Sequence, residues 1–221
     1  MQPLELYIHI PFCVKKCAYC DFLSGPAGEK EKEEYVKMLV DEIRNCPDTV
    51  QNYRVISIFF GGGTPSLLTG EQIGRLMDTV REIFTLDEDA EITMEMNPGT
   101  VTEEKLRKYR QAGVNRLSIG LQSVNDEELR LLGRIHTYEE FLEAYHLARA
   151  NGFSNINVDL ISAIPGQTVE SWRRTLEQVM ALSPEHISAY SLILEEGTTF
   201  YKKYVEDEAK EGPKLPDEDA E

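Results

Sequence analysis

Six short segments of apolar or alternating residues recur along the chain, and each has the length and pattern of a β-strand. They span residues 4–10, 55–60, 91–96, 116–121, 155–161 and 186–193. Helical patterns fill the gaps, most clearly over residues 71–84, where apolar residues recur at helical spacing. Strict alternation of strands and helices favours parallel strands joined by right-handed crossovers. The pattern predicts an α/β fold, a partial, open (β/α)6 TIM-like barrel, since a closed barrel needs eight such units.

Local signals mark the ends of several predicted helices. Thr137 with Glu140 has the pattern of a capping box, and Thr102 followed by two glutamates is typical of a helix start. Gly113 and Gly152 stand where C-terminal caps are expected. These signals support the division into helices and strands.

Most predicted strands have one apolar and one polar face. The strand at 116–121, for example, sets Leu117 and Ile119 against Ser118 and Gly120. Parallel strands covered on both faces usually read as continuous apolar runs, so the alternation indicates that the polar faces line the barrel interior. Such an interior suits a charged, hydrogen-bonding ligand. An antiparallel sheet with one face in water is the alternative, but helices separate nearly every pair of strands.

Charge and composition narrow the possible functions. The 221 residues carry a formal net charge of −16, which disfavours a broad surface for nucleic acid or anionic membranes. No apolar run reaches the ~18 residues that a membrane span needs, so we expect a cytoplasmic protein with no membrane span. Residues 1–205 are predicted to form the core domain. Residues 206–221, with eight acidic and two basic residues, read as an acidic linker that leads to a C-terminal domain absent from this chain.

Three of the four cysteines, Cys13, Cys17 and Cys20, fall within eight residues. Clustered cysteines in an intracellular chain of this length are more often metal ligands than disulfide partners. A [4Fe-4S] cluster normally takes four cysteines, so three indicate a cluster with one iron open to another ligand. A zinc site is the alternative, although zinc usually takes four protein ligands, or three and a water. Cys46 is interpreted as an ordinary half-buried thiol.

Further polar residues follow the C-terminal ends of the predicted strands, where barrel enzymes carry their sites. The Gly-Gly-Gly-Thr-Pro run at 61–65 permits close approach of the backbone to a ligand. Glu95, Gln122 and Asp159 share the polar parity, and Arg134 lies in a connection near the same mouth, where it could pair with a carboxylate. Each side chain alone could simply cap a loop. Together with the cysteines they are expected to converge on one cavity.

Four segments resemble the radical S-adenosylmethionine (SAM) superfamily and, within it, the oxygen-independent coproporphyrinogen III oxidase group. They are YIHIPFC at 7–13, FFGGGTP at 59–65, LSIGLQS at 117–123 and DLISAIPGQT at 159–168. The resemblance covers essentially the whole chain. It implies that the three clustered cysteines hold a [4Fe-4S] cluster whose open iron takes the amino and carboxylate groups of SAM.

The same resemblance implies roles for nine other residues as cofactor-binding groups. Those expected around the first SAM are Tyr7, Tyr19, Gly62, Gly63, Thr64 and Glu95, with the two tyrosines flanking the cofactor. Those that match the oxidase's site for a second SAM are Gln122, Arg134 and Asp159.

Two features bring the chain nearer to the HemW-type haem chaperones of this group than to the oxidases. Phe22 stands two residues beyond the third cysteine, where the oxidase has another cysteine, and Tyr7 lies almost at the start of the chain. The resemblance implies binding of haem or a porphyrin for transfer to haem-accepting proteins, with a flavodoxin- or ferredoxin-type electron donor. The alternative is an oxygen-independent coproporphyrinogen III oxidase, which decarboxylates its substrate to protoporphyrinogen IX. RNA modification is disfavoured by the acidic charge.

Overall fold

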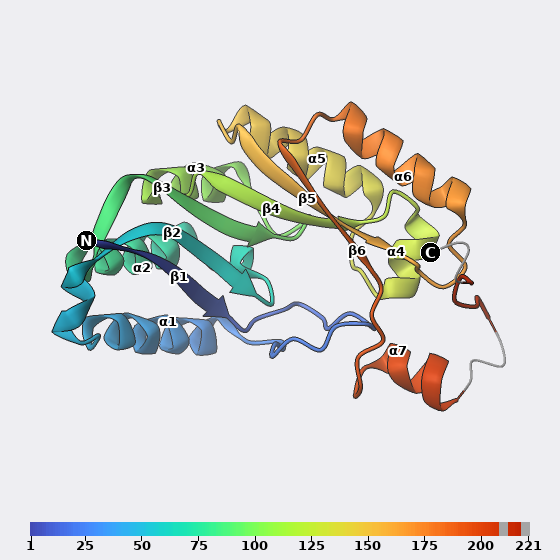
Figure 1. Ribbon diagram of the computed structural model, residues 1–221, viewed down its shortest axis with the longest axis horizontal. Coiled ribbons are helices and arrows are strands. Elements are labelled where there is room, and N and C mark those ends of the chain that lie inside the picture. The colour runs from blue at the N-terminus through green and yellow to red at the C-terminus, as the bar shows by residue number, and fades with distance from the viewer. Residues whose placement is uncertain (208–211, 218–221) are drawn as a thin grey trace.

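The computed structural model describes residues 1–207 and 212–217 and contains six parallel strands in an open half-barrel (Figure 1). The strands are β1 (Gln2–Ile10), β2 (Tyr53–Gly62), β3 (Thr85–Met96), β4 (Arg116–Gln122), β5 (Asn155–Ser162) and β6 (His186–Ser191). They pair in sequence order from β1 to β6, each parallel to its neighbour. The predicted fold class is therefore confirmed, and all six C-terminal strand ends meet at one edge of the sheet.

Each strand differs from its predicted bounds at one end or both, mostly by one or two residues. β2 continues to Gly62, so two of the three successive glycines belong to the strand. β3 begins at Thr85, because Thr85 and Leu86 pair with the start of β2 before the register breaks between Val55 and Ser57. β6 ends at Ser191 rather than at residue 193.

The crossover helices begin and end close to the predicted signals. They are α1 (Glu29–Arg44), α2 (Gly70–Ile83), α3 (Glu103–Ala112), α4 (Asp126–Leu132), α5 (Tyr138–Ala150), α6 (Val169–Ala181) and the short α7 (Thr199–Tyr201). The Thr102 hydroxyl accepts from the Lys105 N–H, and Thr137 with Glu140 forms the predicted capping box. Gly113 and Gly152 adopt the left-handed conformation, with φ of +105° and +82°, which glycine reaches without steric cost.

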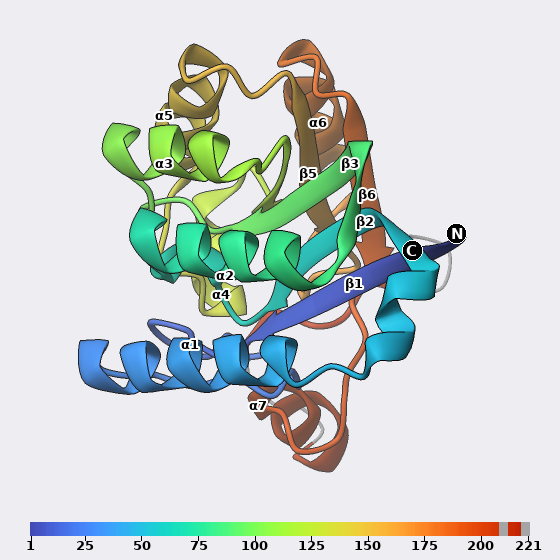
Figure 2. The same ribbon diagram turned by 90° about the vertical axis from the view of Figure 1, so that its left-hand side faces the viewer.

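The apolar faces of the strands pack against helices. Figures 1 and 2 show α1, α2, α3 and α5 side by side on one face of the sheet. The buried core between helices and strands includes Phe60, Met94, Ile119 and Val158. The polar strand faces point away from this core, as the alternation predicts. None of the described helices has the length and apolar character that a membrane crossing requires.

The loop that follows β1 is held by a smaller apolar cluster at the C-terminal edge of the sheet. Leu132, Ile164 and Phe200 form the cluster, and Ala18 and Tyr19 of the loop pack against it. The Ala18 N–H donates to the Leu132 carbonyl, and the Phe200 N–H donates to the Ala18 carbonyl, both at 2.9 Å. The loop therefore lies between the end of α4 and the start of α7 (Figure 1).

The predicted acidic linker falls partly outside the described residues. In its described part, the Lys214 carbonyl accepts from the Gly166 N–H at 2.7 Å. This stretch therefore lies against the loop that precedes α6. The division into a core domain and a linker stays a prediction.

Candidate functional site

A cavity of about 700 Å³ opens on the polar face of the sheet and collects residues from the cysteine loop and from five of the six strands or the loops that follow them. Eleven of the twelve predicted site residues line it: Cys13, Cys17, Tyr19, Cys20, Gly62, Gly63, Thr64, Glu95, Gln122, Arg134 and Asp159. Parallel pairing explains this convergence, since strands far apart in the sequence have their C-terminal ends at the same edge of the sheet.

Tyr7 is the predicted residue that lies outside the cavity lining. Its side chain is 60% exposed, and its ring stacks on Phe59 with centroids 6.1 Å apart. The Tyr7 hydroxyl lies 3.1 Å from His9 Nδ1. Phe59 itself lines the cavity, so Tyr7 is one ring removed from it.

The three clustered cysteines are free, half-buried thiols on one loop. Burial raises the pKa of Cys20, and the neighbouring Cys17 and Cys13 act in the same direction although the Phe22 backbone opposes them. Gly63 makes room for this loop, because a Cβ at that position would lie 2.6 Å from the Phe12 carbonyl oxygen and 2.9 Å from Cys13 Sγ. The residue that follows β2 can therefore lie this close to the cysteine loop only because it is glycine.

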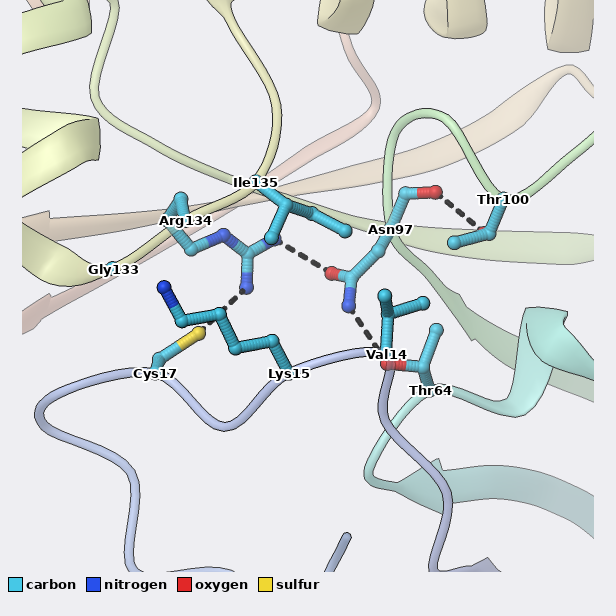
Figure 3. Close-up of a pocket in the computed structure, with 9 residues that line it drawn as sticks. All are labelled: Val14, Lys15, Cys17, Thr64, Asn97, Thr100, Gly133, Arg134 and Ile135. Carbon is cyan, nitrogen blue, oxygen red and sulfur yellow. Dashed lines mark hydrogen bonds between the residues drawn. The ribbon is translucent and has the colours of Figure 1, made fainter. Parts of the chain in front are cut away.

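A chain of hydrogen bonds links two of the cysteine sulfurs through Asn97, and Figure 3 shows the part of it that runs from Cys17 to Thr64. Arg134 Nη1 lies 3.8 Å from Cys17 Sγ, and Arg134 Nη2 donates to Asn97 Oδ1 at 2.7 Å. Asn97 Nδ2 donates to Thr64 Oγ1 at 2.8 Å, and Thr64 Oγ1 lies 3.7 Å from Cys13 Sγ. Arg134 also donates to the Gly120 carbonyl at 2.9 Å. Its partners among the described residues are thus an amide, a carbonyl and a thiol, and not the carboxylate suggested by the sequence.

The role of Asn97 was missed by the sequence analysis. The available signal was its position one residue beyond β3, with the same strand parity as Glu95. Its backbone is fixed as well, since the Asn97 N–H donates to Ser66 Oγ at 3.3 Å and its carbonyl accepts from the Thr100 hydroxyl at 2.6 Å.

Gln122 is held in an unusual conformation at the end of β4. Its φ is +70°, in the left-handed region that few residues other than glycine adopt, and the register with β5 shifts between Gly120 and Gln122. This bulge coincides with a side chain that lines the cavity, and its Oε1 is buried without a partner among the described residues. Arg134 Nε is likewise buried without a hydrogen-bond partner among the described residues. A buried polar atom without a partner is costly, so both atoms indicate a polar ligand in this cavity.

Glu95 faces the cysteine loop from β3. Burial raises its pKa to about 7, the Gly62 N–H that donates to Glu95 Oε2 at 3.0 Å opposes the rise, and the Asp159 carboxylate adds to it. A carboxyl group in this state can exchange a proton near neutral pH and can accept a bond from a cationic ligand group.

A model of the radical SAM superfamily matches residues 7–179, most of the chain. The chain belongs to the radical SAM superfamily. It is 45% identical over its whole length to the haem chaperone HemW of Escherichia coli (strain K12) and 41% identical to that of Haemophilus influenzae. It covers 56% and 57% of those two proteins, and thus spans little more than half of their length.

Solved structures of radical SAM proteins share the fold. The coproporphyrinogen III oxidase HemN of Escherichia coli superposes with a TM-score of 0.87 at 34% sequence identity, over 99% of this chain and 50% of that one. The methyltransferase TsrM of Kitasatospora setae, with cobalamin and a [4Fe-4S] cluster bound, superposes with a TM-score of 0.64 at 16% identity and covers 91% of this chain. The second likeness concerns the fold alone.

The radical SAM family implies a [4Fe-4S] cluster and SAM, and the residues present fit both. Cys13, Cys17 and Cys20 are free thiols on one loop, and in a [4Fe-4S] cluster each thiolate binds a different iron. The unpartnered Gln122 and Arg134 atoms provide polar groups for a bound organic cofactor.

The raised pKa of Glu95 predicts a pH-dependent stability for the protein without cofactors. The folded state holds this proton more tightly than the unfolded state, so the contribution to stability is full below pH 4.5 and is lost as the pH rises to about 7. At about 1.4 kcal/mol per pKa unit, the loss is at most about 3 kcal/mol. Glu95→Gln, which can still accept from Gly62, should therefore match the wild type at pH 4.5 and exceed it at pH 8 in urea unfolding.

Glu91→Gln is the matched control, since Glu91 is an exposed carboxyl on the same strand and with the same parity. The two variants separate the effect of burial from that of removing one negative charge. An equal gain at both pH values for Glu95→Gln, or the same gain for Glu91→Gln, would contradict the assignment.

Proposed function

We propose that the chain is the radical SAM core of a haem chaperone, which binds a [4Fe-4S] cluster, SAM and haem for transfer to acceptor proteins. The observation that carries this proposal is the 45% and 41% identity, over the whole chain, to two proteins named haem chaperone HemW. Phe22 after the third cysteine supports it, because the oxidase pattern has a cysteine there.

In this proposal Cys13, Cys17 and Cys20 hold the cluster. Their shared loop is fixed at both sides: the Cys13 N–H donates to the Gly25 carbonyl, and Ala18 bonds to both α4 and α7. The cluster, when bound, supplies single electrons to SAM chemistry. A small electron-transfer protein of the flavodoxin or ferredoxin type is the proposed reductant.

The cavity residues then divide into two groups. Around the first SAM, Glu95 accepts from the ammonium group, and Gly62, Gly63 and Thr64 offer backbone and hydroxyl partners. Tyr19 closes one side, and Tyr7 supports Phe59 from outside. Gln122, Arg134 and Asp159 offer a carboxamide, a guanidinium and a carboxylate for a second polar ligand.

Large apolar side chains at the cavity support a further, flat and largely apolar ligand such as haem. Phe22, Tyr190 and Ile193 line the cavity and are 57%, 64% and 67% exposed. Exposed aromatic and apolar groups gathered around one concave site are typical of a binding surface.

Haem titration tests the proposed function. We expect the protein, reconstituted anaerobically with its cluster, to bind about one haem per chain with a shifted Soret band, because the exposed apolar side chains at the cavity would be covered. A matched titration with bovine serum albumin, which takes up haem through unrelated apolar sites, sets the scale for non-specific uptake. Absence of saturable binding would refute the proposal.

The cysteine assignment has an internal control in Cys46, a half-buried thiol two residues after α1. After anaerobic reconstitution with iron and sulfide, we expect wild type and Cys46→Ala to hold about four iron atoms per chain. Cys20→Ala should lose most of them, because only two protein ligands remain. A triple variant at Cys13, Cys17 and Cys20 that still assembled the cluster would overturn the assignment.

A second candidate function is oxygen-independent coproporphyrinogen III oxidase activity. The TM-score of 0.87 to HemN and the position of Gln122, Arg134 and Asp159 around one cavity favour it. Incubation with reductant, SAM and coproporphyrinogen III under anaerobic conditions distinguishes the two functions. For a haem chaperone we expect no protoporphyrinogen IX, whereas its formation in turnover amounts would establish the oxidase.

A further inference from the structure

Two of the four segments that carry the family resemblance end in residues that the cofactor sites do not use. Ser123 closes the segment 117–123, and Gln167 is the last residue but one of the segment 159–168. Their side chains meet at Glu128 of α4, which is only 6% exposed. A carboxyl group is almost never this buried unless specific partners hold it.

Hydrogen-bond donors surround both oxygens of the Glu128 carboxyl group. Oε2 accepts from Ser123 Oγ at 2.6 Å and from Gln167 Nε2 at 2.9 Å. Oε1 accepts from the Ser171 hydroxyl and, more weakly, from Asn125 Nδ2 at 3.5 Å. The donors come from the residue after β4, from the N-cap of α4, from the loop before α6 and from α6 itself. Glu128 therefore joins α4 to α6 and to the loop that precedes it.

The direction of these bonds is fixed by the groups behind them. The Ser123 oxygen accepts from the Asn125 N–H at 3.0 Å, so its hydrogen is free for Glu128. A carboxylate only accepts hydrogen bonds, so the Gln167 amide nitrogen must face Glu128. The amide oxygen of Gln167 then faces the Ile164 N–H, at 3.4 Å. Gln167 thus closes the turn of its own loop and ties that loop to α4.

The loop before α6 depends on such a tie. Ala163 has a φ of +58°, in the left-handed region that few residues other than glycine adopt, and such a conformation persists only where the surroundings fix it. The next residue, Ile164, is buried and packs against Leu132, the last residue of α4. Two contacts therefore join this loop to α4, one through Glu128 and one through Leu132.

The C-terminal end of α4 in turn holds the cysteine loop. The Leu132 carbonyl accepts from the Ala18 N–H at 2.9 Å, and Ala18 and Tyr19 pack against the same apolar cluster. Gly133 lies so close that a Cβ on it would be 3.2 Å from the Ala18 nitrogen and 3.6 Å from Cys17 Cα. A shift of α4 would therefore move or release the backbone between Cys17 and Tyr19.

We propose that Glu128 is a positioning residue for the cysteine loop, which it holds through α4. This inference rests on the proposed function in one respect, that the loop binds the cluster. Glu128 is not among the described residues that line the cavity, so its effect on the cluster passes through the helix. Its two oxygens let donors from several elements meet at one buried point, and this contact fixes the loop before a cluster binds.

Hydrogen exchange of the chain without cofactors, followed by mass spectrometry, tests the inference. In Glu128→Ala we expect peptides that cover residues 14–22 to exchange at least about tenfold faster than in wild type, because the buried donors lose their acceptor and α4 loses its anchor. Peptides from α2 report on global unfolding and should not change.

Three further variants complete the test. Glu128→Gln should stay within about twofold of wild type, because its oxygen can accept from Ser123 and Gln167 while its amide group donates to the Ser171 oxygen. Glu127→Ala removes the same charge from an exposed position on α4 and should match wild type. If Glu128→Ala does not fold, Ser171→Ala, which removes one donor only, should raise exchange of the same peptides about threefold.

The second measurement is the release of iron to a ferrous-iron chelator after anaerobic reconstitution. Glu128→Ala should release its iron about tenfold faster than wild type, because the loop opens more often. A merely structural role would raise exchange throughout the chain or leave iron release unchanged.

The outcomes separate the two levels of the proposal. If the peptides at 14–22 exchange as in wild type, or faster only together with α2, the inference is wrong and the proposed function stands. If wild type takes up no iron, the proposed cluster assignment fails, and the exchange result alone decides whether Glu128 holds the loop.

Discussion

Parallel pairing of neighbouring strands in sequence order is the constraint on which the rest of this structure depends. It turns the apolar strand faces towards the helices and the opposite faces of β2 to β6 towards one cavity. It also brings six C-terminal strand ends to a single edge, so that a cysteine loop near the N-terminus meets Arg134 and shares a cavity with Asp159. With six strands the sheet does not close, and a cavity of about 700 Å³ remains on its polar face.

Within this sheet, the direction of one hydrogen bond determines the direction of the next. A guanidinium can only donate, so Arg134 forces the oxygen of Asn97 towards itself and the amide nitrogen towards Thr64. Thr64 must then accept from Asn97, which leaves its own hydrogen free for Cys13. Two sulfurs of the cysteine loop thus receive donors whose directions are set by one arginine. On β5, Asp159 fixes the orientation of Asn157 in the same way. The amide nitrogen of Asn157 faces Asp159, and its oxygen faces His186.

The sequence predicted the parts of this molecule that depend on local pattern. Strand and helix periodicity, the capping residues and the glycine run at the end of β2 are all readable from neighbouring residues. The long start of β3 was missed because Asp87, Glu88 and Asp89 interrupt any strand pattern. Asn97 was missed for a different reason: its role depends on Thr64 and Arg134, which come from other parts of the chain.

An open barrel has two edge strands, and this one protects both against pairing with other chains. In the part of the chain that the structure describes, β1 and β6 each have a neighbour on one side only, and unpaired edges of this kind invite aggregation. In β1, the exposed Pro3 and Glu5 and a register irregularity between Leu4 and Glu5 interrupt the edge, while β6 is only six residues long. The chain can therefore keep an open cavity beside β6 without offering a long, regular template for intermolecular β-sheet.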